Sequence, residues 1–161
     1  HVYTVEAERK NALLIHLIQT GDWQQALVFA SAKNTCNRLV LKLEKAGIQA
    51  AAFHGDLSQS ARNNALADFK AKHIRVLIAT DVAARGIDIQ QLPYVVNFDL
   101  PRSANDYIHR IGRTGRAGQQ GYAIALICPD EYEHFKLIEK RMKKRLSREQ
   151  IEGFEIPLVG E

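Results

Sequence analysis

The segment from Asp106 to Gly118, DYIHRIGRTGRAG, carries the side chains best suited to chemistry. Arg110 follows His109 directly, and Arg110, Arg113 and Arg116 are spaced three residues apart. Side chains three residues apart lie on one side of a helix, so this spacing predicts guanidinium groups that point to one place. A guanidinium is always charged and binds phosphate through two parallel hydrogen bonds. The cluster therefore suits a polyphosphate or a nucleic-acid backbone.

A solvated helix face is the alternative interpretation, because arginines on a helix are most often exposed surface residues. Three glycines argue against it: Gly112, Gly115 and Gly118 alternate with the arginines. Each glycine costs a helix about 1 kcal/mol relative to alanine. The segment is therefore interpreted as a ligand site.

Length and charge place few limits on function. The chain has 161 residues, enough for one domain with its own core, and its net charge of +4 favours polyanionic partners. It lacks an initiator Met, so we expect residues 1–161 to be a piece of a longer protein, and no apolar run reaches membrane-spanning length. The protein is expected to be cytoplasmic and monomeric. Cys36 and Cys128 are expected to be buried free thiols, as in a reducing compartment.

Apolar runs alternate with helical patterns along the chain. Strands are expected at residues 1–5, 26–30, 48–53, 75–80, 94–98 and 121–128. Helices are expected at residues 6–20, between Ser31 and Gly47, after Ser58, after Ser103 and at about residues 130–146, with a C-terminal extension at 147–161. The expected helix caps are Ser31, Ser58, Asp130 and a capping box of Ser103 with Asp106. This order predicts an α/β fold with a mainly parallel central sheet that helices cover on both faces.

Ligands bind beyond the carboxyl ends of the strands in such sheets. Ser31, Gly55, Thr80 and the approach to the arginine-rich helix each follow an expected strand. We therefore expect them to share one rim of the sheet.

Four segments carry a resemblance to a known family. They are HRIGRTGRAG at 109–118, ATDVAARGIDI at 79–89, LVFAS at 27–31 and FHGDLSQSAR at 53–62. In that order, they resemble motif VI, motif V, motif IV, and motif IVa with QxxR of the DEAD-box RNA helicases. Along the chain the motifs occur in the family's order and extend over nearly its whole length. HRIGRTGR begins with His, whereas the corresponding motif of the similar DEAH and RecQ helicases begins with Gln. The overall sequence resembles that of bacterial members of the RhlE type. The resemblance implies the second, RecA-like domain of such a helicase, with three α/β/α layers.

The resemblance also implies a nucleotide site. Arg113 and Arg116 would be arginine fingers that reach the γ-phosphate of ATP, which the N-terminal RecA-like domain holds with Mg²⁺. His109 would contact that domain and respond to closure, although a structural hydrogen-bonding role is its alternative. Gly86 and Asp88 match the family's ribose and nucleotide contact, whereas a loop Asp is as often a turn former.

Further residues match the family's RNA-backbone contacts: Ser31, Gly55, Gln59, Arg62, Thr80 and Asp81. Alternatives stay open, because Thr80 could cap the following turn, and Gln59 with Arg62 could form a surface pair with a nearby acid. Arg110 could pair with Asp106 or Asp81 in its own domain. Contacts to phosphate and sugar imply RNA binding without base specificity and with strong salt dependence.

The sequence contains neither a GxxxxGK[ST] phosphate loop nor the DEAD carboxylates that hold Mg²⁺. No metal site is therefore expected in this chain, and the chain alone should not hydrolyse ATP. Joined to its N-terminal domain, it would be half of an ATP-driven clamp that locally unwinds RNA. The alternatives are a non-enzymatic RNA-binding adaptor and half of a DNA translocase.

Overall fold

The computed structural model describes residues 1–85, 89, 91–114 and 121–157. The strands are β1 (Val2–Thr4), β2 (Ala26–Phe29), β3 (Ala50–Phe53), β4 (Val76–Ala79), β5 (Tyr94–Asn97), β6 (Tyr122–Ile127) and β7 (Arg148–Glu149). The helices are α1 (Lys10–Thr20), α2 (Lys33–Lys45), α3 (Gln59–Lys70), α4 (Asp81–Ala84), α5 (Ala104–Ile111) and α6 (Tyr132–Met142), with 3₁₀ turns at Ala7–Arg9 and Pro129–Glu131.

Within these residues, seven strands form one sheet in the order β3-β4-β2-β5-β6-β1-β7. Every pairing in it is parallel. The register places Phe29 of β2 beside Ala79 of β4 and beside Asn97 of β5, while Phe53 of β3 also lies beside Ala79. The strand ends therefore lie in one row, and the predicted parallel sheet is confirmed.

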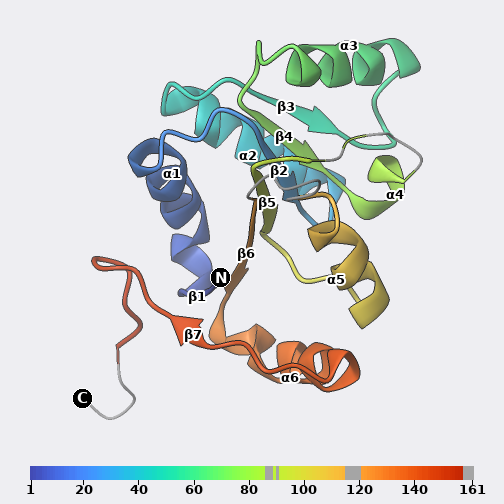
Figure 1. The fold of residues 1–161 in the computed structure, drawn as a ribbon. Coiled ribbons are helices and arrows are strands. Elements are labelled where there is room, and N and C mark those ends of the chain that lie inside the picture. Colours follow the sequence, from blue (N-terminus) through green and yellow to red (C-terminus); the bar gives the residue numbers. More distant parts are fainter. Residues whose placement is uncertain (86–88, 90, 115–120, 158–161) are drawn as a thin grey trace.

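The two faces of the sheet are covered by different helices, because alternate residues of a strand point to opposite faces. Ala26 and Val28 pack in one core cluster with residues of α1 and α2. Leu27 and Phe29 pack in a second cluster with residues of α3, and a third cluster joins α5 and α6 to β1 and β6. Figure 1 shows the sheet between these layers. The predicted three-layer α/β/α arrangement is confirmed.

Two of the predicted helix caps, at Ser58 and Ser103, are confirmed. Ser58 caps α3, since its Oγ accepts a hydrogen bond from the amide of Ala61 at 3.1 Å. Ser103 caps α5 by accepting from the amide of Asp106 at 3.1 Å, but the Asp106 carboxylate pairs with Arg85 and does not complete the box.

Two other caps were predicted wrongly. The residue before α2 is Ala32, and the Ser31 side chain turns away to bond Asp99. At the start of α6, Glu131 reaches back to the amide of Cys128, so that Asp130 is not the cap. At α2 the Asp99 carboxylate occupies the predicted cap residue, and at α6 the Glu131 carboxylate, one residue after Asp130, bonds the free amide.

The arginine-rich helix is shorter than predicted. It ends at Ile111, and Arg113 lies in the turn that follows. The amide of Leu92 donates to the carbonyl oxygen of Arg113 at 3.0 Å, and Leu92 forms a parallel bridge with Thr114. Since these bonds draw the chain away from the helix axis, Arg113 is positioned by the segment near Leu92 and not by helical spacing.

Both cysteines are buried free thiols, as predicted. Burial raises the pKa of Cys36 to about 11, so this thiol is protonated at neutral pH. Among the described residues, none of the helices is long and apolar enough to span a membrane.

The C-terminal part adds an edge strand that the sequence patterns did not predict. Arg148 of β7 donates from both terminal nitrogens to the two carboxylate oxygens of Glu139 on α6, at 2.6 Å each. The amide of Leu146 donates to the same carboxylate at 2.7 Å. Burial by itself raises the pKa of Glu139, but Arg148 and the Leu146 amide outweigh it, so this pKa lies below its ordinary value of 4.5.

The Glu139 carboxylate should therefore make stability depend on pH. A lowered folded-state pKa contributes stability that is present above pH 4.5, the unfolded-state value, and is lost as the pH falls through the folded-state value. The Glu139→Gln variant should be less stable by about 2 kcal/mol at pH 7. Urea titrations at pH 7 and pH 3 should show the gap between variant and wild type closing in acid. An unchanged gap at pH 3 would contradict this assignment.

Candidate nucleotide and nucleic-acid interface

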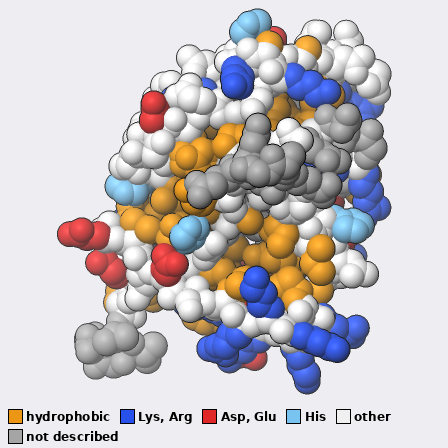
Figure 2. All heavy atoms as spheres, viewed as in Figure 1, with side chains coloured by type: hydrophobic (Ala, Val, Ile, Leu, Met, Phe, Trp, Pro, Cys, Tyr) orange, Lys and Arg blue, Asp and Glu red, His pale blue; other side chains and the backbone are white. Residues whose placement is uncertain are grey.

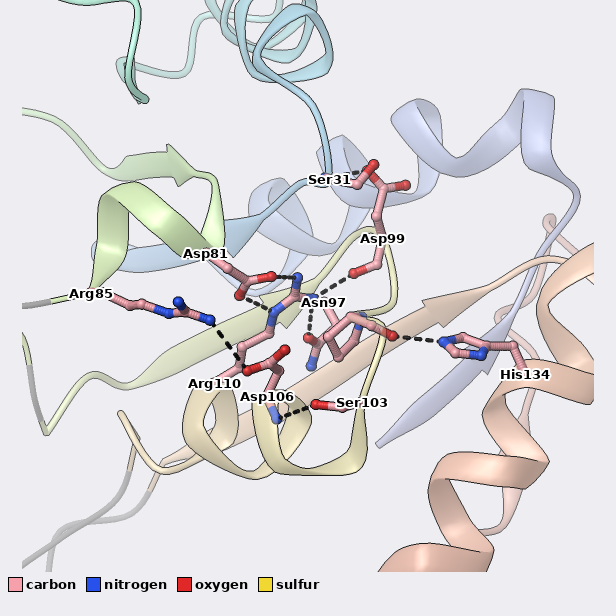
Figure 3. A network of polar contacts seen from close by, with 10 residues as sticks. Ser31, Asp81, Arg85, Asn97, Asp99, Ser103, Asp106, Arg110 and His134 are labelled. Atoms are coloured by element: carbon pink, nitrogen blue, oxygen red, sulfur yellow. Dashed lines mark hydrogen bonds and ion pairs between the residues drawn. The ribbon is translucent and has the colours of Figure 1, made fainter.

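The Arg110 guanidinium lies at the centre of a polar network at the carboxyl ends of the strands (Figure 3). It is 2% exposed. Its Nε and Nη2 donate to the two carboxylate oxygens of Asp81, at 2.7 and 2.5 Å. Its Nη1 donates to Asn97 Oδ1 at 2.8 Å and to the carbonyl oxygen of Asp99 at 2.6 Å. The predicted pairing of Arg110 within its own domain is confirmed, with Asp81 as the partner.

A polar residue at the end of β5 accommodates this buried charge. Asn97 is fully buried and lies beside Phe29 and Ala125 in the strand register, where an apolar residue would extend the core. Its Oδ1 instead accepts from Arg110, whose guanidinium also lies 4.9 Å from the centre of the Phe29 ring. A buried charge is stabilised only where its donors are satisfied. Arg110 therefore serves to hold α5 against the strand ends.

Asp99 extends the network to the loop after β2. Its carboxylate oxygen Oδ2 accepts from the amide and the hydroxyl of Ser31, at 2.8 and 3.1 Å. Asp99 thus contacts Arg110 through its carbonyl and Ser31 through its side chain (Figure 3). The predicted common rim is confirmed for these segments, because one chain of hydrogen bonds joins the ends of β2, β4 and β5 to α5.

A small cavity of about 50 Å³ opens beside this network. The residues that line it are Phe29, Asp81, Ala84, Arg85, Asp106, His109, Arg110 and Arg113. The His109 side chain is exposed, and Arg85 lies 3.7 Å from the Asp106 carboxylate. The cavity therefore collects three guanidinium groups and one imidazole around two carboxylates.

Arg113 reaches this cavity from the turn after α5. Its Nη2 donates to the carbonyl oxygen of Ala84 at 3.0 Å, and its Nη1 to that of Ile89 at 3.4 Å. Both carbonyls belong to the segment after β4. These two hydrogen bonds orient the guanidinium of Arg113, a group that is always charged.

Three predicted nucleotide-site residues lie outside the described residues: Gly86, Asp88 and Arg116. The nucleotide contact of Gly86 and Asp88 and the finger role of Arg116 stay predictions.

The turn that contains Gly55 is held by its buried neighbour. The Nδ1 of His54 accepts from the amide of Asp56 at 3.3 Å, and its Nε2 lies 2.8 Å from Asn37 Oδ1. This places the imidazole proton on Nε2, which donates to the amide oxygen. A methyl group at Gly55 would meet no atom within 4 Å. The domain's own packing thus leaves open space at Gly55.

Gln59 and Arg62 lie in the first turns of α3. Arg62 Nη2 donates to Gln59 Oε1 at 3.1 Å, and Gln59 Nε2 donates to Asn63 Oδ1 at 2.9 Å. In the described part of the chain no carboxylate pairs with Arg62, and its Nε is buried without a hydrogen-bond partner. The alternative of a surface pair with an acid is therefore wrong for the described residues.

Thr80 precedes α4, but its side chain makes no capping hydrogen bond, so the capping alternative is wrong. Asp81 is engaged by Arg110, and Ser31 by Asp99. Direct RNA contacts by these three residues stay predictions.

Sequence reasoning missed Asn97, Asp99 and His54 as positioning residues. Each lies at or just beyond the end of a buried strand, and a polar residue at such a position was the feature of the sequence that could have indicated a positioning role. Their partners come from other strands and helices, so their roles depend on the strand register.

The rim fits polyanions. Arg62, Arg113 and the exposed start of α3 place cations and backbone amides along it. The residues present therefore fit a sugar–phosphate backbone near Gly55 and a polyphosphate near Arg113.

Comparisons with known proteins agree with this arrangement. The model of the helicase conserved C-terminal domain matches residues 9–118. An ATP-dependent RNA helicase RhlB of Pseudomonas syringae pv. tomato is 40% identical over 149 residues, which are 92% of this chain and 38% of that relative. This chain thus spans well under half of that relative's length.

Solved structures show the same fold. The E. coli DEAD-box protein SrmB, bound to regulator of ribonuclease activity A, matches with a TM-score of 0.89 and 36% identity over 95% of this chain and 91% of that one. S. cerevisiae Dbp5, bound to RNA and ADP BeF3, matches with a TM-score of 0.81 and 34% identity over 94% of this chain and 41% of that one. The predicted RecA-like fold is confirmed, and the chain belongs to the helicase conserved C-terminal domain family, as the second helicase domain of the DEAD-box RNA helicases.

Proposed function

We propose that this chain acts as the second domain of an ATP-dependent RNA helicase, where it binds the RNA backbone and adds positive charge to ATP held by an N-terminal domain. The observation that carries the proposal is the Arg110 network. It joins Ser31 and Asp81, on the proposed RNA side, to α5, whose end leads to Arg113. A single hydrogen-bonded network would thus connect the two proposed binding sites.

The relatives support this proposal. A relative of similar sequence is named an ATP-dependent RNA helicase, and the Dbp5 structure contains RNA and ADP BeF3. The finer assignment to the RhlE type stays a prediction.

The mechanism follows from what the chain's own residues do. When the N-terminal domain closes on this chain, Arg113 comes to lie at the nucleotide, held in orientation by Ala84 and Ile89. ATP with Mg²⁺ supplies a phosphoryl group whose transfer is accelerated by positive charge at the transition state. Arg116 would act in the same way, and His109 would contact the N-terminal domain.

On the RNA side, Gly55 and the start of α3 approach the backbone, and Arg62 binds a phosphate. Contacts of this type do not discriminate between bases. Because Asp99 and Arg110 connect this rim to α5, closure on RNA and placement of Arg113 occur together, which makes ATP turnover depend on RNA.

Gly55 offers a specific test of the RNA contact. Because a methyl group there meets open space, Gly55→Ala should leave the melting temperature unchanged. It should weaken RNA binding by the longer protein about tenfold, the loss of roughly 1–1.5 kcal/mol for one close backbone contact. Fluorescence anisotropy with labelled poly(U) measures this effect.

Gly47→Ala is the matched control. Gly47 has a φ of +83°, a conformation that strains an alanine, so this variant should lose about 1 kcal/mol of stability and bind RNA normally. Normal RNA affinity in Gly55→Ala would contradict the proposed contact.

The function is tested by ATP turnover of the longer protein that contains this chain. Turnover that rises with single-stranded RNA supports the proposal, and this chain alone should be inactive. RNA binding without turnover would favour the adaptor, and stimulation by single-stranded DNA alone would favour the translocase.

A further inference from the structure

A groove between α5 and α6 lies apart from the site described above. Its volume is about 500 Å³, and it shares no lining residue with the cavity beside Arg110. Residues from the beginning of α5 form one wall, and one face of α6 forms the other. Figure 2 shows apolar atoms in the region of α5 and Lys and Arg side chains gathered along the edge where α6 lies.

Part of the groove lining is apolar. Ile108 of α5 is 46% exposed and Leu137 of α6 is 62% exposed, and both line the groove beside the buried Ile138. Single exposed apolar residues are common on protein surfaces. Here two of them come from different helices and meet in one concave place, which is typical of a site for an apolar anchor.

The groove lining also carries positively charged side chains. Arg102 and Arg141 line it together with His134, whereas none of its lining residues is acidic. In the described part of the chain neither arginine is in an ion pair. The Nε2 of His134 donates to the carbonyl oxygen of Pro101 at 2.7 Å, so this ring is held against the loop before α5.

The positive charge continues along α6 into the following turn. A neighbouring hollow of about 410 Å³ is lined by Lys136, Glu139, Lys140, Lys143, Lys144 and Arg145. Its one carboxylate, that of Glu139, is bound by Arg148. The field around the groove is therefore set by cations, which attract acidic partners and speed their association.

We propose that this groove binds an acidic segment of another protein, with a bulky apolar side chain of that segment over Ile108 and Leu137 and carboxylates at Arg102 and Arg141. Arginine forks match carboxylates well, and apolar anchors with a charged rim are typical of a peptide bound between helices. RNA fits this place less well, since the exposed Ile108 and Leu137 have no use for a sugar–phosphate backbone and His134 is the one aromatic side chain among the lining residues. The inference does not depend on ATP turnover.

The test is a selection from a displayed library of random 16-residue peptides on the 161-residue chain, whose three core clusters lie within it. The enriched peptides should carry net negative charge and at least one large apolar residue. Their Kd is then measured by anisotropy for two groove variants, Leu137→Ser and Arg141→Glu. Leu137→Ser should weaken binding about tenfold or more because the apolar anchor loses its contact, and Arg141→Glu about tenfold or more because a carboxylate then repels the acidic segment.

Two substitutions on α2 provide matched controls. Leu41 is 61% exposed, almost as much as Leu137, and Lys45 is an exposed cation. Leu41→Ser and Lys45→Glu should leave the Kd unchanged.

Four outcomes would overturn the inference. They are no enriched peptide, enriched peptides without negative charge, binding that Leu137→Ser does not weaken, and an effect of Leu137→Ser on poly(U) binding in place of peptide binding. Sedimentation of the wild type and Leu137→Ser provides a fifth: a dimer that this substitution dissociates would assign the groove to a second copy of the chain.

Discussion

Replacing Arg113 by alanine is expected to reduce RNA-stimulated ATP turnover by the longer protein about 1,000-fold, the lower end of what an arginine finger contributes. The loss should fall on kcat, because the guanidinium would act on charge that develops in the transition state. RNA affinity should stay near the wild-type value, since the proposed RNA contacts come from Gly55, the start of α3 and Arg62, whereas Arg113 lies beside the segment of Ala84 and Ile89. Steady-state kinetics at saturating RNA measure the effect.

Stability must be separated from catalysis in this variant. Loss of the two carbonyl contacts should cost about 1 kcal/mol of unfolding free energy, a small change that urea titration detects. Arg145→Ala removes the same charge from an exposed position after α6 and should leave kcat unchanged. An Arg113→Ala protein with wild-type kcat would show that this arginine only joins α5 to the segment after β4.

Replacing Arg110 by alanine is expected to lower the unfolding free energy of this chain by about 2–4 kcal/mol. The substitution leaves the Asp81 carboxylate and the buried Asn97 Oδ1 without their donor, and such losses cost several kcal/mol. The 29% exposure of the Asp81 side chain reduces the effect, because water screens part of the charge. Urea titration measures the loss.

A double variant separates the structural role of Arg110 from its role in coupling. Arg110→Met with Asp81→Asn removes both charges, so that stability should recover in part. RNA-stimulated turnover should stay low, because the link from Asp99 to α5 is still missing. Arg75→Ala is the control: Arg75 donates to the carbonyl oxygen of Trp23 from the amino ends of the strands, so its loss should affect stability alone. Full turnover in the double variant would contradict the proposed coupling.

Several features could be predicted from the sequence because they are local. Buried parallel strands are short continuous apolar runs, as at Leu27 and Phe29, and the cap at Ser58 needs only its own helix turn. The partner of Arg110 was among the predicted alternatives because Asp81 directly follows a predicted strand that ends at the same rim.

Other features could not be predicted because distant residues decide them. Asn97 and Asp99 acquire their roles from the register of β5 beside β2, which no local pattern encodes. The Ser31 hydroxyl had a plausible local use as a cap, but the Asp99 carboxylate binds it instead. The end of α5 at Ile111 depends on the bonds between Leu92 and the turn after the helix. Competition between local and tertiary partners is what sequence patterns leave out.

The proposed function requires that closure of two domains, of which this chain is one, holds RNA and nucleotide together. The most direct measurement is the dissociation of labelled poly(U) from the longer protein in ADP with beryllium fluoride, compared with this chain alone. We expect a long-lived complex for the longer protein, rapid dissociation from this chain, and rapid dissociation from the Arg110→Met, Asp81→Asn protein. If this chain alone holds RNA as long, with or without nucleotide, closure of two domains is not what retains the RNA.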